Sequence, residues 1–187
     1  RHDYGRDSAL RRESPAACAE LSRWASRCDK AYKDTFARAY ATQREWLEAN
    51  VLPCWRLGDT SWSSGIVNKN SCLHYHRDQG NAKGTINAML VMRSRSTGGA
   101  LVIPELNLAH ACEGGTLFLF HAARFWHGVT PIKVRPGGYR YSVVYYLLSG
   151  LANCKSPEEE LVRAKRRRTE IEQRKREYET TGGRKEE

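Results

Sequence analysis

The sequence lacks any apolar run of the roughly 18 residues that a membrane-spanning helix needs, and its first 14 residues contain no apolar signal segment. Its six cysteines include no CxxC pair and no paired spacing, which argues against a zinc cluster or a disulfide framework. No segment repeats. These absences predict a soluble intracellular protein with reduced, mostly buried thiols and no membrane partner.

Acidic residues are scarce in the middle of the chain. The net charge is +10, and residues 61–154 hold 9 basic and only 3 acidic side chains, whereas residues 1–60 and residues 155–187 each hold 11 basic and 9 acidic ones. A net charge of +6 in the middle favours a polyanionic partner such as nucleic acid, through phosphate contacts and the release of counterions. The alternative is a generic basic surface that keeps the protein soluble.

The length of 187 residues and the apolar content of 40% suit one domain with one hydrophobic core. Within residues 1–60, Ser14-Pro15 has the form of a helix N-cap followed by proline at the first helical position. A second helical stripe, with spacings of four, four and seven residues, should end near Pro53 and pack on a sheet. It consists of Tyr32, Phe36, Tyr40 and Leu47.

Residues 61–154 have the pattern of short β-strands. The predicted strands cover residues 65–68, 72–75, 85–93, 100–103, 116–120 and 139–148. Turn signals separate several of them, at Gly98-Gly99, Gly114-Gly115 and Pro136-Gly137-Gly138. Many short strands without helical periods between them predict an antiparallel jelly roll. The expected fold class is therefore α+β, with a helical segment (residues 1–60) packed on a jelly-roll core (residues 61–154).

The last segment, residues 155–187, has the pattern of a charged helix. Ser156-Pro157-Glu158-Glu159 has the form of a capping box with proline at the first helical position. The basic runs at residues 165–168 and 174–176 are nearly balanced by acids, so we expect a solvated helix, with a phosphate-contacting tail as the alternative. Residues from Thr180 on should fray. The candidate ion pairs at i, i+4 spacing are Glu170/Arg174 and Glu172/Arg176.

The run His76-Arg77-Asp78 is the first candidate for chemistry. On a strand, residues i and i+2 share a face, so the His76 imidazole and the Asp78 carboxylate can be directed at one metal ion. A third ligand must come from another strand, and His127, 51 residues after His76, is the best candidate. Two imidazoles and one carboxylate on one face of the metal leave positions open for a cosubstrate and dioxygen, as in non-haem Fe(II) oxygenases.

Arg140 and Ser142 share a strand face by the same i, i+2 rule. A planar, bidentate guanidinium inside a barrel calls for a carboxylate, and the acid-poor middle of the chain offers few. An external dicarboxylate such as 2-oxoglutarate would meet that need, with its keto acid on the iron and its distal carboxylate on Arg140 and Ser142. Together these motifs predict an Fe(II)/2-oxoglutarate dioxygenase, and a non-catalytic cupin-like barrel is the alternative.

Four segments within about residues 62–148 form a recognisable set. They are HRDQGN from His76, GGALVIPE from Gly98, WHGVTP from Trp126 and RYSVVYY from Arg140. Together they resemble the TET/JBP family of nucleic-acid 5-methylpyrimidine dioxygenases, and within it the compact phage and protist members. The resemblance implies a double-stranded β-helix that oxidises the methyl group of 5-methylcytosine in DNA, or of thymine in the JBP branch.

Transferred residue by residue, the resemblance puts His76, Asp78 and His127 on the iron, and Arg140 and Ser142 on 2-oxoglutarate. These are the same residues that the spacing singles out.

The resemblance also implies two contacts to an extruded base, with Asn81 as a polar contact and Tyr146 as an aromatic wall of the pocket. Asn68 and Asn70 precede the HxD motif where related oxygenases place a polar contact to the cosubstrate, and a turn or strand-ladder role is the alternative for both. Leu148 departs from the pattern, because several cytosine-oxidising members carry a base-contacting histidine there. This departure puts the preference for cytosine over thymine in question.

The expected function is hydroxylation of 5-methylcytosine in methylated double-stranded DNA by a monomer that uses Fe(II), 2-oxoglutarate and dioxygen. A methyl group inside a duplex cannot reach a buried iron, so the base must be extruded and its stacking replaced. Candidate stacking surfaces, each with a core position as the alternative, are Trp62, Tyr75, Trp126 and Tyr146.

Three other functions stay open. They are thymine hydroxylation to 5-hydroxymethyluracil, hydroxylation of a protein or small molecule, and nucleic-acid binding by an inactive barrel. The expected location is the cytoplasm of a bacterial host if a phage encodes the chain, and the nucleus otherwise.

Overall fold

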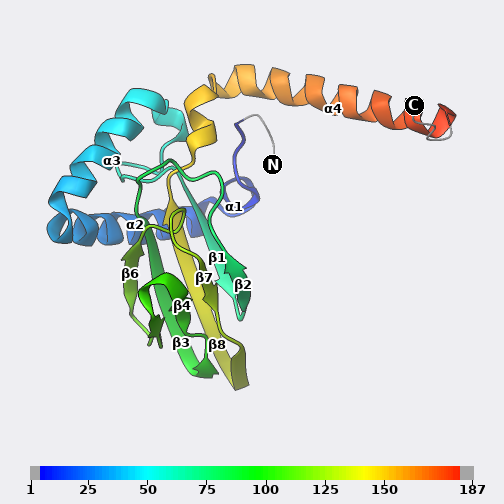
Figure 1. The fold of residues 1–187 in the computed structure, drawn as a ribbon. Coiled ribbons are helices and arrows are strands. Elements are labelled where there is room, and N and C mark those ends of the chain that lie inside the picture. The colour runs from blue at the N-terminus through cyan, green and yellow to red at the C-terminus, as the bar shows by residue number, and fades with distance from the viewer. Residues whose placement is uncertain (1–4, 182–187) are drawn as a thin grey trace.

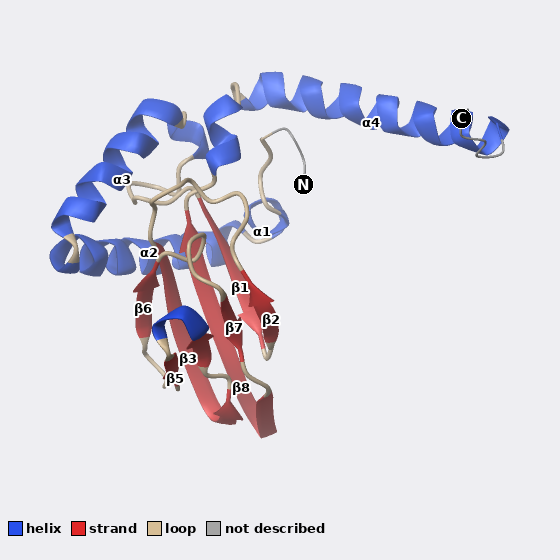
Figure 2. Ribbon diagram, in the orientation of Figure 1, coloured by secondary structure: helices blue, strands red, loops and turns tan. Residues whose placement is uncertain are grey.

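A computed structural model describes residues 5–181 and places two four-stranded antiparallel sheets face to face, with helices at one end and on one side (Figures 1 and 2). One sheet has the strand order β1-β8-β3-β6 and the other β2-β7-β4-β5. This α+β arrangement confirms the predicted fold class. The strands are β1 (Ser64–Lys69), β2 (Leu73–His76), β3 (Asn87–Gly98), β4 (Leu101–Ile103), β5 (Leu108–His110), β6 (Leu117–Phe120), β7 (His127–Val129) and β8 (Ile132–Tyr146).

Strand β8 is longer than the sequence pattern predicts. It begins at Ile132 and continues through Pro136-Gly137-Gly138, so the prediction of a turn between strands at this triplet is wrong. Ser94 pairs with Tyr139 and Ser96 with Val134, which leaves residues 135–138, the triplet among them, in a bulge opposite Arg95 of β3. Gly137 has a φ of +72°, a left-handed conformation that glycine adopts without strain. A Pro-Gly-Gly triplet is compatible with a turn between strands and with a bulge inside one strand. The pairing with a neighbouring strand decides which of the two forms.

The short strands β5 and β7 have three residues each and were absent from the prediction. Three residues are too few to establish an alternating pattern. β7 is nevertheless a central strand, paired with β2 on one side and β4 on the other.

The chain begins with helices α1 (Ala9–Glu13), α2 (Pro15–Thr35) and α3 (Ala37–Asn50). The predicted helix start at Ser14-Pro15 is confirmed, although the Ser14 side chain makes no capping bond. The predicted continuous stripe is wrong, because Phe36 lies between α2 and α3 in a non-helical conformation (φ −132°, ψ 55°) and is 43% exposed. Short 3₁₀ turns follow at Pro53–Trp55, Pro104–Leu106 and Ser149–Asn153.

Helix α2 crosses the outer face of the sheet that contains β8 (Figure 2). The ring of Trp62, which is fully buried, stacks between Tyr32 and Tyr145 with centroid distances of 6.0 and 5.7 Å. The Tyr145 hydroxyl donates a hydrogen bond of 2.7 Å to the Leu21 carbonyl of α2. Trp62 is therefore a core residue, which excludes it as a stacking surface for a base.

A second core fills the space between the two sheets. It contains Met89, Val91, Leu101, Ile103 and Cys112. All six cysteines are free thiols. Cys28, Cys112 and Cys154 are buried, whereas Cys54 and Cys72 are exposed, so the prediction of mostly buried thiols holds for only half of them.

Helix α4 (Pro157–Thr181) extends away from the strands (Figure 1). The predicted capping box is confirmed: the Ser156 N–H donates to Glu159 Oε2 at 3.1 Å, and the Glu159 N–H donates to Ser156 Oγ at 3.4 Å. Glu170 and Glu172 pair with arginines one turn earlier, Arg166 at 3.5 Å and Arg168 at 3.0 Å, rather than with the arginines predicted.

The helix continues through Thr180, where fraying was expected, and residues 182–187 of the predicted frayed end lie outside the described residues. Among the described helices, none combines the length and apolar character needed to cross a membrane.

Asp29 of α2 ties the helices to the chain that enters β1. Its Oδ1 accepts hydrogen bonds from the N–H and the hydroxyl of Ser61 at 2.8 and 2.6 Å, and its Oδ2 accepts one from the Tyr40 hydroxyl at 2.9 Å. Asp29→Ala should lower the free energy of unfolding by about 3 kcal/mol, because it leaves buried donors without partners. Urea denaturation measures this loss. Ser26→Ala on an exposed face of the same helix is the control, and equal stability of the two variants would contradict the role of Asp29.

Candidate functional site

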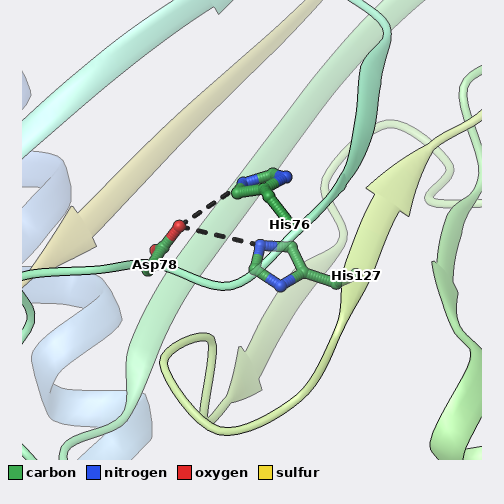
Figure 3. Close-up of side chains that lie close together, drawn as sticks. All are labelled: His76, Asp78 and His127. Atoms are coloured by element: carbon green, nitrogen blue, oxygen red, sulfur yellow. Dashed lines mark ion pairs between the residues drawn. The ribbon is translucent and has the colours of Figure 1, made fainter.

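Three of the predicted residues, His76, Asp78 and His127, lie close together (Figure 3). His76 is the last residue of β2, Asp78 follows just past the strand, and His127 is the first residue of β7, paired with His76. Asp78 Oδ1 lies 3.4 Å from His76 Nε2 and 3.8 Å from His127 Nε2. One ligand atom from each residue lies within 4.8 Å of the others, so one metal ion can contact all three.

The placement of Asp78 differs from the prediction. The sequence pattern puts both residues of the HxD motif on one strand, whereas β2 ends at His76. The loop after the strand, rather than strand alternation, turns Asp78 toward the imidazoles.

The two imidazoles are oriented by backbone carbonyls. His76 Nδ1 lies 2.8 Å from the His74 carbonyl and His127 Nδ1 lies 3.0 Å from the Phe125 carbonyl. A carbonyl only accepts, so each Nδ1 carries the proton and each Nε2 keeps its lone pair for a metal. Burial lowers the pKa of His127, which also favours the neutral, ligating form.

The Asp78 carboxylate is held from its other side by two asparagines. Its Oδ2 accepts hydrogen bonds from Asn81 Nδ2 at 3.2 Å and Asn87 Nδ2 at 2.9 Å, and the Asp78 N–H donates to the Ala122 carbonyl at 3.0 Å. Asn81 is 8% exposed and also donates from Nδ2 to Asn87 Oδ1 at 3.2 Å. These bonds fix the carboxylate so that Oδ1 faces the imidazoles. Asn87 was not predicted as a site residue, because it lies at the start of β3 with no motif around it.

A second group that was not predicted, Glu105, contacts the residues adjacent in sequence to the three candidate ligands. Glu105 Oε1 accepts hydrogen bonds from Arg77 Nη2 at 3.1 Å and from the Trp126 N–H at 3.0 Å, and the Arg77 guanidinium lies 5.3 Å from the centre of the Trp126 ring. These contacts, first among them the Trp126 N–H, lower the pKa of Glu105. Because Arg77 lies between His76 and Asp78, and Trp126 precedes His127, Glu105 joins the two ligand-bearing segments. Glu105 is one of only three acidic residues in positions 61–154, and this scarcity was the one feature of the sequence that could have pointed to it.

Arg140 and Ser142 lie on β8 and are buried between the sheets, with Arg140 only 1% exposed. Arg140 Nη2 donates to the Gly99 carbonyl at 2.9 Å, while Nε has no hydrogen-bond partner and no carboxylate of the described residues lies within ion-pair distance. Burial lowers the pKa of Arg140. A Cβ on Gly99, whose φ is +71°, would lie 2.6 Å from Arg140 Nε. A buried guanidinium without an anion is costly, so this position fits a carboxylate ligand such as that of 2-oxoglutarate.

The remaining residues singled out in the sequence lie on or next to β1 and β8, and their contacts differ from one another. Asn70 has a φ of +52°, and its Oδ1 accepts a hydrogen bond of 2.8 Å from the Arg140 backbone N–H, which is the ladder role left open for it. Asn68 of β1 pairs with Ser142 of β8. Tyr146 ends β8, and Leu148 forms an isolated β-bridge with Asn81.

Comparisons with known proteins fit this geometry. The model of the Tet_JBP family, described as the oxygenase domain of the 2OGFeDO superfamily, matches residues 6–149. The bifunctional helicase and thymine dioxygenase JBP2 of Trypanosoma brucei brucei (strain 927/4 GUTat10.1) is 31% identical over 124 residues, which are 66% of this chain and 11% of that protein. The chain therefore spans about a tenth of this relative.

The fold is also similar to that of a solved structure, NgTET1 in complex with 5mC DNA. The TM-score is 0.68 at 14% sequence identity, and the match covers 88% of this chain and 64% of that one. This likeness supports the jelly-roll assignment.

The family match extends over most of the chain, and the His-Asp-His cluster and the unpaired buried arginine suit the cofactors of that superfamily. Fe(II), 2-oxoglutarate and dioxygen are accordingly the cofactor and cosubstrates. The chain belongs to the Tet_JBP family of 2-oxoglutarate/Fe(II)-dependent oxygenases.

Proposed function

We propose that this chain hydroxylates the 5-methyl group of a pyrimidine base in DNA, with 5-methylcytosine as the first candidate. The observation that carries the proposal is a three-ligand cluster, His76, Asp78 and His127, in the same sandwich as a buried arginine without an anion. Membership of the Tet_JBP family supports the reaction class. The names of the relatives, a thymine dioxygenase and a complex with 5mC DNA, support the substrate class.

In this proposal His76, Asp78 and His127 hold Fe(II), and Arg140 and Ser142 hold the distal carboxylate of 2-oxoglutarate. Bound Fe(II) with 2-oxoglutarate and dioxygen supplies the oxidation, which puts one oxygen atom into a methyl C–H bond and the other into succinate, with loss of carbon dioxide. Ser142, two residues after Arg140 on the same strand and also buried, would donate its hydroxyl to the carboxylate that Arg140 holds.

The chain's own residues orient the reactants and limit water. The His127 side chain is 8% exposed, while those of His76 and Asp78 are 39% and 25% exposed, so the cluster is open on the His76–Asp78 side. A methyl group can approach from that side. Orientation of the methyl group at a fixed ligand set is the main contribution that a protein makes to such a reaction.

The hydrogen bonds of Asn81 support cytosine. Its Nδ2 is directed at Asp78 and Asn87, and because Asp78 Oδ2 has to accept, the carboxamide cannot be turned around. No described residue donates to Asn81 Oδ1, so that oxygen can accept a hydrogen bond from the exocyclic amine of cytosine. The O4 of thymine only accepts and would find no partner there. Thymine is also present throughout DNA, and an enzyme that accepted it freely would modify DNA indiscriminately.

Thymine is the second candidate, and two observations favour it. JBP2 is a thymine dioxygenase with 31% identity to this chain, and Leu148 supplies no polar contact that would select an amine. The base choice therefore depends on one hydrogen bond, which allows a discrimination of roughly 5- to 150-fold.

Mass spectrometry of nucleosides tests the function directly. After incubation of the full chain with Fe(II), 2-oxoglutarate and duplex DNA that holds both bases, we expect 5-hydroxymethylcytosine in excess over 5-hydroxymethyluracil. His127→Ala should abolish the product because it removes a ligand, whereas His74→Ala, an exposed histidine outside the cluster, should retain it. An excess of 5-hydroxymethyluracil would assign thymine. Equal succinate release with and without DNA, and no oxidised base, would overturn the proposal.

Arg140→Lys should raise the KM for 2-oxoglutarate by about tenfold or more, because it keeps the charge and loses the bidentate fork. DNA affinity should stay unchanged. Initial rates at varied 2-oxoglutarate concentration measure the effect, and Arg135→Lys, an exposed position on the same strand, is the control. An unaltered KM would put the carboxylate site elsewhere.

Asn87→Ala should weaken binding of Co(II), used as a spectroscopic substitute for Fe(II), by about 10- to 100-fold, because Asp78 loses the shorter of its two side-chain hydrogen bonds. Titration of the metal-free chain measures the affinity without any turnover. The control is Asn50→Ala at the exposed end of α3. If Asn87→Ala binds Co(II) as tightly as the control, the amide bonds do not position the carboxylate.

A further inference from the structure

A large cavity lies at the end of the sandwich where α4 begins. Its volume is about 830 Å³, and part of its wall is formed by Tyr146, Leu148 and Gly80. Gly80 is two residues beyond Asp78, and Tyr146 is the last residue of the strand that carries Arg140. The cavity therefore adjoins the loop that holds the candidate iron ligand.

Basic side chains outnumber acidic ones in the described lining of this cavity, although two of its four arginines form ion pairs, Arg11 with Asp7 and Arg163 with Glu160. Asp7 is the single acid among its described lining residues, and it forms an ion pair of 3.0 Å with Arg11. The four basic lining residues come from four places in the chain: the segment before α1, α1 itself, the turn after Trp55, and α4. They are Arg6, Arg11, Arg56 and Arg163.

The cavity wall is fixed by buried contacts. Glu160, 1% exposed, accepts hydrogen bonds from the Gly5 N–H at 2.7 Å and the Lys155 N–H at 2.8 Å, which joins the N-terminal segment to the start of α4. Arg56 donates from Nε to the Val51 carbonyl at 2.8 Å, and a carbonyl does not cancel its charge. Glu160 also forms an ion pair of 3.6 Å with Arg163. Arg56 and Arg163 are thus held by the fold before any ligand arrives, which lowers the entropic cost of binding an anion.

We propose that this cavity binds the sugar–phosphate backbone next to the extruded nucleotide, and this inference rests on the proposed function. A base that reaches the iron remains attached to its strand, so the flanking phosphodiesters must lie at the entrance beside Asp78 and Tyr146. Guanidinium groups bind phosphate oxygens in a bidentate manner. A cavity lined by four arginines and one acid fits this polyanion. The arginines come from the N-terminal segment, from the turn after Trp55 and from α4.

Two arginines of α4 provide a matched test. Both pair with a glutamate of the same helix, Arg163 with Glu160 at 3.6 Å and Arg168 with Glu172 at 3.0 Å. Arg163 lines the cavity, whereas Arg168, five residues later, lies outside the lining. Fluorescence anisotropy with a labelled duplex that contains one 5-methylcytosine, and the metal-free full chain, measures affinity independently of turnover. We expect Arg163→Ala and Arg6→Ala each to weaken binding about 3- to 10-fold and to reduce the slope of log K against log salt by about one, across all sequences.

Arg168→Ala should leave both quantities at the wild-type values. Thermal melting of each variant checks that the fold is retained. A loss of affinity in Arg168→Ala with none in Arg163→Ala and Arg6→Ala would overturn the proposal and assign phosphate binding to the exposed part of α4. Unchanged binding in all three variants of a chain that still oxidises DNA bases would overturn it as well, whereas absence of oxidised bases from the wild-type chain is the failure of the proposed function.

Discussion

The carboxylate of Asp78 is the group on which the geometry of the site depends. One oxygen faces two imidazoles and the other accepts two amide hydrogen bonds, so the group cannot rotate without breaking one of these contacts. Its partners come from the strand before it, the strand after it and the loop that leads to β7. Because these segments belong to both sheets, the positions of the three ligands follow from how the sheets are packed.

The sequence was sufficient for the residues whose chemistry is local. Arg140 and Ser142 share a face of β8 because they are two residues apart on a regular strand, and the capping box of α4 is confined to four consecutive residues. The supporting contacts could not be predicted in the same way. Asn87 and Glu105 act on ligands that are distant in the sequence, through contacts that depend on strand register and loop conformation. Neither strand register nor loop conformation produces a repeating pattern in the sequence.

Aromatic residues illustrate the same limit. Trp62 and Trp126 both lie beside short polar or turn-like segments. The local composition therefore does not predict which of the two is buried and which is exposed. In the structure Trp62 is fully buried between two rings, whereas Trp126 is 46% exposed and is covered on one side by Arg77. The difference comes from helix α2, which covers one sheet and leaves the other without a helical layer (Figure 2). Trp126, which lies just before β7 of the uncovered sheet, keeps a face in contact with water.

The long strand β8 also sets a fixed spacing in the molecule. It carries the buried arginine at one point and the last aromatic residue of the sandwich six positions later, a distance of about 20 Å along an extended chain. Because neighbouring side chains alternate between faces, inserting one residue within this stretch would turn everything beyond it to the opposite side. The bulge at Pro136-Gly137-Gly138 lies outside the stretch and already accommodates extra residues. Changes of length over evolution should therefore accumulate at the bulge, while the stretch from Arg140 to Tyr146 keeps a constant length.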